Sequence, residues 1–195
     1  IDGAFNSSLV GPNIANFEAI YFGNEFGGAP PKILLKGNQL TLGIHSTGPG
    51  LNQILILENV EVRFDSNSFT FNTTNATLRN QGKLNLRGSA PGKTITINGN
   101  YEGYTDSKIL MNTQLNGDSS VTDKLVINGN SSGTSAVNVT NVGGTGAKTV
   151  NGIPVILVSG NSNAVFTLDN KVQVGAFEYF LVKNGKDWIL DSSGA

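Results

Sequence analysis

The 195-residue chain contains no cysteine, only one histidine and few charged residues. Without cysteine it forms no disulfide and offers no thiolate to a metal, and the lone His45 does not make a zinc site. We therefore assign no metal and no cofactor to the chain. Charged residues make up 14% of the sequence and the formal net charge is −1. The chain thus has neither the basic footprint that a nucleic-acid partner requires nor an acidic tail.

Long apolar runs and helical patterns are also missing. No apolar stretch approaches the roughly 18 residues of a membrane-spanning helix, and no segment of ten or more residues shows a 3.6-residue period. No signal peptide is present, so we expect that an exported form would be a processed piece of a longer protein. The absence of cysteine suits export, because a periplasmic disulfide can trap a folded intermediate before it crosses a narrow pore.

The residues that are abundant favour turns and strands. Glycine occurs 25 times, asparagine is equally frequent, and the apolar remainder is largely Val, Ile, Leu and Phe. Most apolar runs are short and are divided by polar breaks that contain Gly, Asn or Pro. This composition predicts an all-β protein with many turns.

A repeated motif indicates how the strands are arranged. The segment Ile-Asn-Gly-Asn at 97–100 recurs at 127–130. Imperfect repeats of short strands and Asn-Gly turns predict a right-handed parallel β-helix with rungs of about 12 to 25 residues. An antiparallel sandwich or jelly roll is the competing interpretation, because it also has short strands at close intervals. The scarcity of charge and the Asn-Gly repeats favour the solenoid.

The pattern changes towards the C-terminus. Asn184-Gly185, between two apolar runs, predicts a two-residue hairpin turn. The apolar phase flips across Gly175-Ala176, which indicates a β-bulge. Trp188 and Leu190 share a face and are expected opposite the aromatic residues of the preceding strand. We therefore predict an antiparallel, β-sandwich-like hairpin cap that protects the open edge of the last rung.

The region 121–190 resembles the C-terminal passenger segment of pertactin-like, type V autotransporters of Gram-negative bacteria. The resemblance rests on Asp-Lys-Leu-Val-Ile-Asn-Gly at 123–129, on the Val-Asn-Val-Thr-Asn stretch at 137–141, and on Val-Gly-Ala-Phe-Glu-Tyr at 174–179. It implies β-helix passenger rungs over 1–120 and an autochaperone region over 121–195. It also implies a partner, the chain's own outer-membrane β-barrel translocator, which is absent from this sequence.

In such a family the passenger leaves the cell as an unfolded hairpin, reaching the surface through the periplasm and the outer membrane. The resemblance implies that the cap folds outside first and templates the rungs, which supplies a nucleus for a non-local β fold. The apolar density of the C-terminal part agrees with this role. We place these residues in the nucleating core: Leu125, Ile127, Val155, Ile156, Phe166, Val174, Phe177, Tyr179, Leu181, Trp188 and Leu190.

Two short motifs resemble catalytic or ligand-binding loops. The segment 129–133 has the letters of a nucleophile elbow, but no histidine and no helix pattern follow it. The segment 88–94 is one residue shorter than a phosphate-binding loop and leads into a strand. Both are predicted to be turns. Nothing in the sequence places two carboxylates across a groove as a glycan-hydrolysing pair, so four of them are predicted to be solvated surface groups: Glu58, Glu61, Asp65 and Glu102. Three aspartates stay open as single metal sites: Asp106, Asp118 and Asp123.

The sequence therefore predicts a non-enzymatic passenger of the adhesin type, secreted or held at the bacterial surface, whose rungs and loops bind a host surface or matrix protein. Tyr21, Phe22 and Phe26 are the candidate partner contacts, with packing over the first rung as the alternative. A glycan-active β-helix enzyme is the second hypothesis, and a chaperone cap without a binding role is the third.

Overall fold

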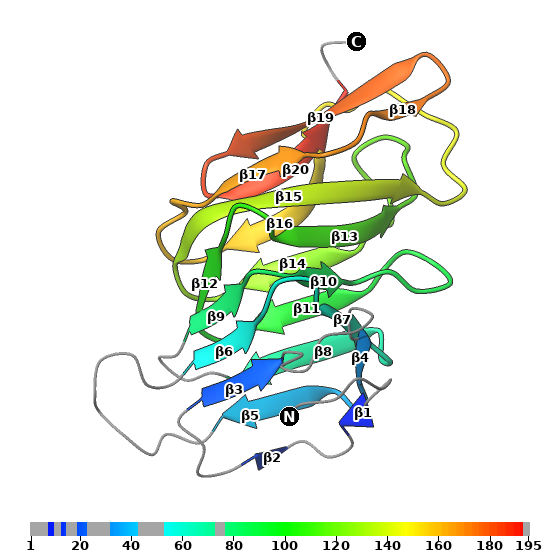
Figure 1. The fold of residues 1–195 in the computed structure, drawn as a ribbon. Coiled ribbons are helices and arrows are strands. Elements are labelled where there is room, and N and C mark those ends of the chain that lie inside the picture. Colours follow the sequence, from blue (N-terminus) through cyan, green and yellow to red (C-terminus); the bar gives the residue numbers. More distant parts are fainter. Residues whose placement is uncertain are drawn as a thin grey trace.

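The chain folds into a stack of short β-strands. The computed structural model describes residues 8–9, 13–14, 19–22, 32–42, 53–72 and 77–192. Within these ranges every regular element is a strand, and the strands form a parallel β-solenoid. The N-terminal strands lie at one end of the stack and the C-terminal strands at the other (Figure 1). The predicted solenoid is confirmed, and the antiparallel sandwich is wrong because strands of successive turns pair in parallel.

Each turn contributes one strand to each of three faces. Face 1 contains β1 (Ser8–Leu9), β4 (Lys32–Leu35), β7 (Glu61–Phe64), β10 (Lys83–Asn85), β13 (Lys108–Thr113), the second part of β15 (Ser131–Asn141) and β17 (Val165–Leu168). Face 2 contains β2 (Asn13–Ile14), β5 (Gln39–Leu42), β8 (Ser68–Asn72), β11 (Thr94–Ile97), β14 (Lys124–Ile127) and β16 (Ile153–Val158). Face 3 contains β3 (Ala19–Phe22), β6 (Gln53–Ile56), β9 (Thr77–Asn80), β12 (Asn100–Gly103) and the start of β15.

Three further strands extend face 2 beyond the last turn. They are β18 (Val172–Val174), β19 (Phe177–Asn184) and β20 (Asp187–Asp191). The order of face 2 at this end is β18-β19-β20-β16-β14, and the pairs β18–β19, β19–β20 and β20–β16 are antiparallel. The predicted antiparallel cap is therefore present, but it begins at β18, because β16 still pairs in parallel with β14.

The length of chain in one turn varies, and some turns are longer than the sequence predicted. Lys83 pairs with Glu61 of the preceding turn. Gln53 pairs with Ala19, across a much longer stretch of chain. The predicted turn length was too short for such cases because consecutive apolar runs belong to neighbouring faces of one turn, not to successive turns.

Strand residues alternate between the core and the surface. In β11, Ile95 and Ile97 are fully buried and the two threonines are half-buried. The inward-facing aliphatic and aromatic side chains of all three faces join one hydrophobic cluster that extends into the cap. Burial of these side chains is the main driving force for stacking the turns.

The corner between faces 2 and 3 carries a ladder of asparagines. The Nδ2 of Asn98 donates to the Oδ1 of Asn72, and the Nδ2 of Asn128 donates to the Oδ1 of Asn98, each at 2.7 Å. The backbone N–H of Gly129 donates to the carbonyl of Gly99 at 2.9 Å. The repeated Ile-Asn-Gly-Asn motif is thus one corner stacked on the same corner of the next turn.

A buried polar cluster crosses the core near face 3. The hydroxyl of Tyr101 lies 2.7 Å from the Oγ of Ser135 and accepts a hydrogen bond of 3.3 Å from the Nδ2 of Asn80. The Oγ of Ser107 lies 2.7 Å from that of Ser135. Burial raises the pKa of Tyr101, so the phenol stays protonated and keeps its place in the cluster. These bonds join three successive turns.

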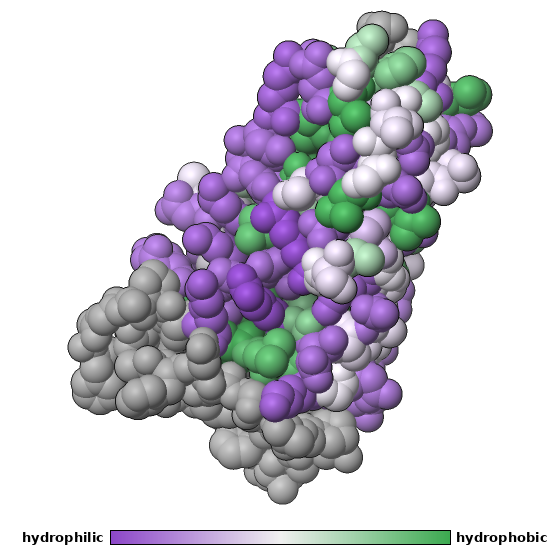
Figure 2. Space-filling view, turned by 90° about the vertical axis from the view of Figure 1, so that its right-hand side faces the viewer, coloured by the Kyte–Doolittle hydropathy of each residue, from purple (hydrophilic) through white to green (hydrophobic). Residues whose placement is uncertain are grey.

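The outer surface is mostly hydrophilic. Figure 2 shows the side that faces right in Figure 1, where hydrophobic residues of the described part form small separate patches. The exposed large apolar side chains in the described ranges are Val121, Val150, Val165, Phe180 and Val182.

Candidate folding cap

The last turn changes from parallel to antiparallel pairing at β16. Its residues Ile153, Val155, Ile156 and Val158 are buried, and the alternation of buried positions shifts by one between Val155 and Ile156. The register of β16 against β20 shifts at the same place, after Pro154. Proline has no N–H for the ladder, and such residues are tolerated at irregularities of this kind. The bulge lets β16 bury side chains from both parts of the strand.

Two tight turns form the cap. The β18–β19 turn has Gly175 and Ala176 at its centre, and Gly175 has a φ of 58°. A two-residue hairpin turn with glycine first requires this positive φ. The predicted β-bulge at this place is therefore wrong: the apolar phase changes because the chain reverses. The β19–β20 turn is centred on Gly185-Lys186, one residue later than predicted, since Asn184 pairs with Asp187.

Aromatic side chains connect the cap to the solenoid. The rings of Phe166 and Trp188 meet edge to face, with centroids 5.5 Å apart, and Phe166 also lies 6.0 Å from Tyr101. Such pairs contribute about 0.5–1.5 kcal/mol beyond their burial. The residue opposite Trp188 on β19 is Lys183, whose ammonium lies 6.0 Å from the indole centroid. The expected aromatic partner on the preceding strand is thus wrong, and the ring partner comes from β17.

The hydroxyl of Tyr179 fixes β19 to two loops. It accepts the backbone N–H of Ala147 at 2.9 Å, and the carbonyls of Asn116 and Ala147 lie within 2.8 and 3.0 Å as acceptors for its proton. Because Tyr179 is 1% exposed, these bonds have no competition from solvent. One side chain of the cap thereby holds loops from two earlier turns.

The end of β20 is clamped to the loop before β16. The backbone N–H of Thr149 donates to the Oγ of Ser192 at 3.0 Å, and the N–H of Ser192 donates to the Oγ1 of Thr149 at 2.8 Å. The Oγ1 of Thr149 donates to Asp191 at 2.7 Å. Thr149 and Ser192 are fully buried. This reciprocal pair joins the last described residues of the chain to a loop that lies well before the cap in sequence.

Two aspartates accept backbone N–H groups at the corners of the solenoid. The carboxylate of Asp118 accepts the N–H groups of Val150, Asn151 and Gly152 at 2.8 to 3.0 Å. These hydrogen bonds, that of Val150 first, lower the pKa of Asp118, because they favour the charged form. The corner therefore holds an ionised carboxylate at neutral pH.

Asp123 has the same function inside the fold. Its carboxylate accepts the N–H groups of Gly92, Lys93 and Asn112 at 2.7 to 2.9 Å, and the residue is fully buried. Burial raises the pKa of Asp123, and the N–H donors oppose this rise. The sequence had offered Asp118 and Asp123 only as single metal ligands. An Asn-Gly-Asp turn such as 116–118 is the local signal that predicts an N–H acceptor.

All the predicted nucleus residues for which burial is described belong to the cap or the adjoining core. Those fully inside the cluster are Leu125, Ile127, Val155, Ile156, Phe166, Tyr179, Trp188 and Leu190, and those packed against it are Val174, Phe177 and Leu181. Their role in nucleation stays a prediction, as does the boundary between 1–120 and 121–195. Tyr21 and Phe22 lie in β3, where only the backbone is described, and Phe26 and His45 lie outside the described residues.

The two loop-like motifs form corners of the solenoid. Residues 88–93 form the loop that precedes β11, and residues 128–130 form the turn before β15. Glu61 is paired with Arg63 at 2.6 Å and Glu102 with Arg79 at 2.9 Å. No group of three potential ligands gathers in the described ranges, and no helix there is long and apolar enough to cross a membrane.

The fold and its closing hairpin define the capped end of a parallel β-solenoid. Residues 61–181 match the model of the autochaperone domain type 1 family, and the chain belongs to this family. It is the autochaperone region of an autotransporter passenger, a class of protein found at the cell surface or secreted.

Relatives of this chain include named autotransporters. It is 49% identical to the Escherichia coli K12 protein YuaQ over 119 residues, which is 58% of this chain and 9% of that protein. It is 37% identical to the probable autotransporter YfaL of the same strain over 143 residues, which is 69% of this chain and 11% of YfaL. It is 43% identical to the autotransporter adhesin AIDA-I of Escherichia coli over 107 residues, which is 52% of this chain and 8% of AIDA-I. The matched region thus spans about a tenth of the length of these relatives.

Proposed function

We propose that the cap nucleates folding of the β-solenoid as the passenger emerges through its own outer-membrane translocator, and that the fragment is not an enzyme. The observation that carries this proposal is a difference in loop closure. The hairpins β18–β19 and β19–β20 close through two-residue turns. Each parallel pair must instead close a full turn of the solenoid, as β7 with β10 and β3 with β6 do. Non-local pairs lose more chain entropy before they gain contacts, so the cap is the least costly place for a nucleus.

A folded cap also offers hydrogen-bond acceptors to the turns that arrive later. The Oδ1 of Asp187 in the cap accepts the N–H of Val158 at 2.9 Å. One turn further on, the Oδ1 of Asp123 accepts the N–H of Lys93 at 2.8 Å. Corner N–H groups without a strand partner need such acceptors when they become buried. Each completed turn therefore presents a template for the preceding one, and pairing proceeds from the C-terminus.

The order of folding tests this role. When the chain refolds from urea under pulsed hydrogen exchange, amides of β19, β20 and β16 are expected to become protected first. Amides of β14, β11 and β8 should follow in that order, because each strand pairs with the strand that became protected just before it. Protection of β8 and β11 before the cap, or at the same time as the cap, would contradict the proposal.

The surface of the solenoid is proposed to bind a host surface or matrix protein. The support comes from two relatives that are named adhesins. One is AIDA-I, and the other is the Brucella suis protein BmaC, to which this chain is 44% identical over 100 residues. Saturable binding of the purified chain to host cells is expected. The double variant Trp188→Ala/Tyr179→Ala, which loses the cap, should not bind. Absence of binding by the folded wild-type chain would leave only the folding role.

A further inference from the structure

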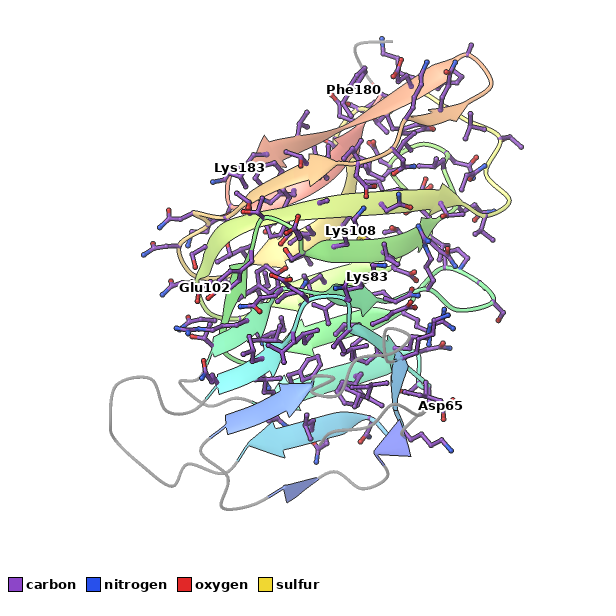
Figure 3. The ribbon with its side chains drawn as sticks, in the orientation of Figure 1. Asp65, Lys83, Glu102, Lys108, Phe180 and Lys183 are labelled. Carbon is purple, nitrogen blue, oxygen red and sulfur yellow. The ribbon has the colours of Figure 1, made fainter. Side chains whose placement is uncertain are left out.

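A cationic pocket lies at the corner between face 1 and face 2, away from the cap. Its volume is about 360 Å³, within the range of about 300–1,000 Å³ that is usual for small-molecule sites. The end of β7 and the loop before β11 form it, and Asp65, at the right-hand edge of Figure 3, marks its place. The charged residues that line it are Arg63, Arg87, Lys93 and Asp65. Two further carboxylates lie beside these cations: Glu61 pairs with Arg63 at 2.6 Å, and Asp123 interacts electrostatically with Lys93 and Arg87.

Lys93 supplies the strongest argument for a ligand. It is only 6% exposed, and its ammonium donates to the carbonyl of Phe64. An ammonium has three N–H donors, and among the described residues no carboxylate lies within 4.0 Å of this one. The buried carboxylate of Asp123 compensates part of this charge, but a buried ammonium that keeps free donors still favours an anion from solution more than an exposed lysine does.

The two arginines keep their positions through bonds that leave further donors. Arg63 uses its Nε for Glu61, and its side chain is 48% exposed. Arg87 uses its Nε for the carbonyl of Met111 and one terminal nitrogen for Asn138. A guanidinium has five N–H donors, so both side chains retain donors for an oxyanion. Positions fixed in advance reduce the entropy lost when a ligand binds.

The loop that borders the pocket does not act as a phosphate-binding loop. The N–H groups of Gly92 and Lys93 both donate to Asp123, at 2.9 and 2.8 Å. The backbone therefore offers these donors to its own carboxylate, and a ligand is held by side chains. The same bonds fix the loop on β14, which makes the pocket part of the rigid solenoid.

The remaining walls fit a sugar ring. Leu34, Ala90 and Pro91 line the pocket beside the charged groups, whereas the ring of Phe64 packs inside the core against Phe69 and Phe71. Most of the lining surface is polar, so these three residues give the ring a small apolar contact beside the charged groups. The carboxylate of Asp65 can accept a hydrogen bond from a sugar hydroxyl, and it opposes a second negative charge.

We propose that this pocket binds a single sulfate or phosphate monoester carried on a sugar. Lys93 and the two arginines hold the oxyanion, and the apolar walls with Asp65 hold the ring. The proposal does not depend on the folding role of the cap, because it concerns the folded chain.

Calorimetric titration of the folded chain with glucose 6-phosphate, glucose 6-sulfate, glucose and inorganic sulfate tests the site. Both esters are expected to bind, and the tighter one identifies the source of the anion. Their affinity should fall as salt is added, because the contact is ionic, and glucose should not bind. Equal binding of inorganic sulfate and the esters would overturn the sugar part, and no ester binding would overturn the whole proposal.

Variants assign the contact. Arg63→Gln is expected to weaken ester binding about tenfold, because it removes a charged hydrogen bond at an exposed position where folding is not at risk. Lys93→Met should abolish binding, with circular dichroism confirming the fold. Asp65→Asn should tighten binding several-fold by removing repulsion. Lys83→Gln, in a separate groove beside β10, is the matched charge control and should change nothing. Unchanged affinity in Arg63→Gln, or an equal loss in Lys83→Gln, would overturn the proposal.

Discussion

Gly133→Ala is expected to destabilise the solenoid by about 3–5 kcal/mol, from the left-handed backbone and the steric clash together. Gly133 has a φ of 75° and lies where β15 passes from face 3 to face 1. A Cβ there would lie 1.9 Å from the carbonyl oxygen of Gly103 on the neighbouring strand. Because the clashing oxygen belongs to the backbone of β12, no side chain can move to relieve the contact, and β12 and β15 must separate.

Gly143→Ala is the matched control. Gly143 has a φ of 76°, nearly the same as Gly133, but a Cβ there would have nothing within 4 Å. Its cost should be only the left-handed backbone penalty of about 1–2 kcal/mol. The two variants are compared by thermal unfolding, where each kcal/mol corresponds to about 2–4 °C for a chain of this size. Equal melting temperatures would show that the strands at Gly103 and Gly133 are not in close contact.

Local patterns predicted the strands well because burial alternates along them. Ile95 and Ile97 face the core and the threonines between them do not, as their sequence indicates. The same holds for Val137 and Val139 in β15. The period of two follows from strand geometry alone, so it is visible without knowledge of the partner strand.

The register between turns could not be predicted in this way. The length of chain between paired residues changes from turn to turn, because the corners differ in length: Lys83 pairs with Glu61, whereas Gln53 reaches back to Ala19. Only the Asn-Gly corner repeats closely enough to reveal its stacking, in which Asn128 bonds to Asn98. Where corners differ, an apolar run fits several registers equally well.

The sequence also did not show whether the chain continues or reverses at Gly175-Ala176. A shift of apolar phase occurs both at a bulge, where the strand continues, and at a two-residue turn, where it reverses. The pairing of Val174 with Phe177 decides for the turn. Only the partner strand distinguishes the two.

The partners of the buried and corner polar side chains were the hardest feature to predict. Asp118, Asp123 and Lys93 belong to residue types that are usually exposed, and their partners are far away in sequence. Asp118 binds N–H groups of the following turn, and Asp123 binds N–H groups of the preceding one. Such partners follow from the register, so they become visible only when the turns are stacked.

Phe166→Ala and Phe71→Ala form the pair that separates a folding nucleus from ordinary core. Phe166 lies on β17 at the cap and Phe71 on β8, three turns below, and both are buried in the same hydrophobic cluster. Each has two aromatic neighbours. Truncation to alanine is expected to cost about 3–5 kcal/mol in either case. Equilibrium stability alone therefore does not distinguish them.

The kinetics are expected to differ strongly. If the cap is formed in the transition state, the loss in Phe166→Ala appears in the refolding rate, which slows by roughly 100-fold for about 3 kcal/mol. In Phe71→Ala the same loss appears in the unfolding rate, because β8 pairs after the barrier. Stopped-flow refolding and unfolding in urea measure both rates. A slower refolding of Phe71→Ala than of Phe166→Ala would place the nucleus in the N-terminal turns, and the C-terminal hairpins would then protect an edge without starting the fold.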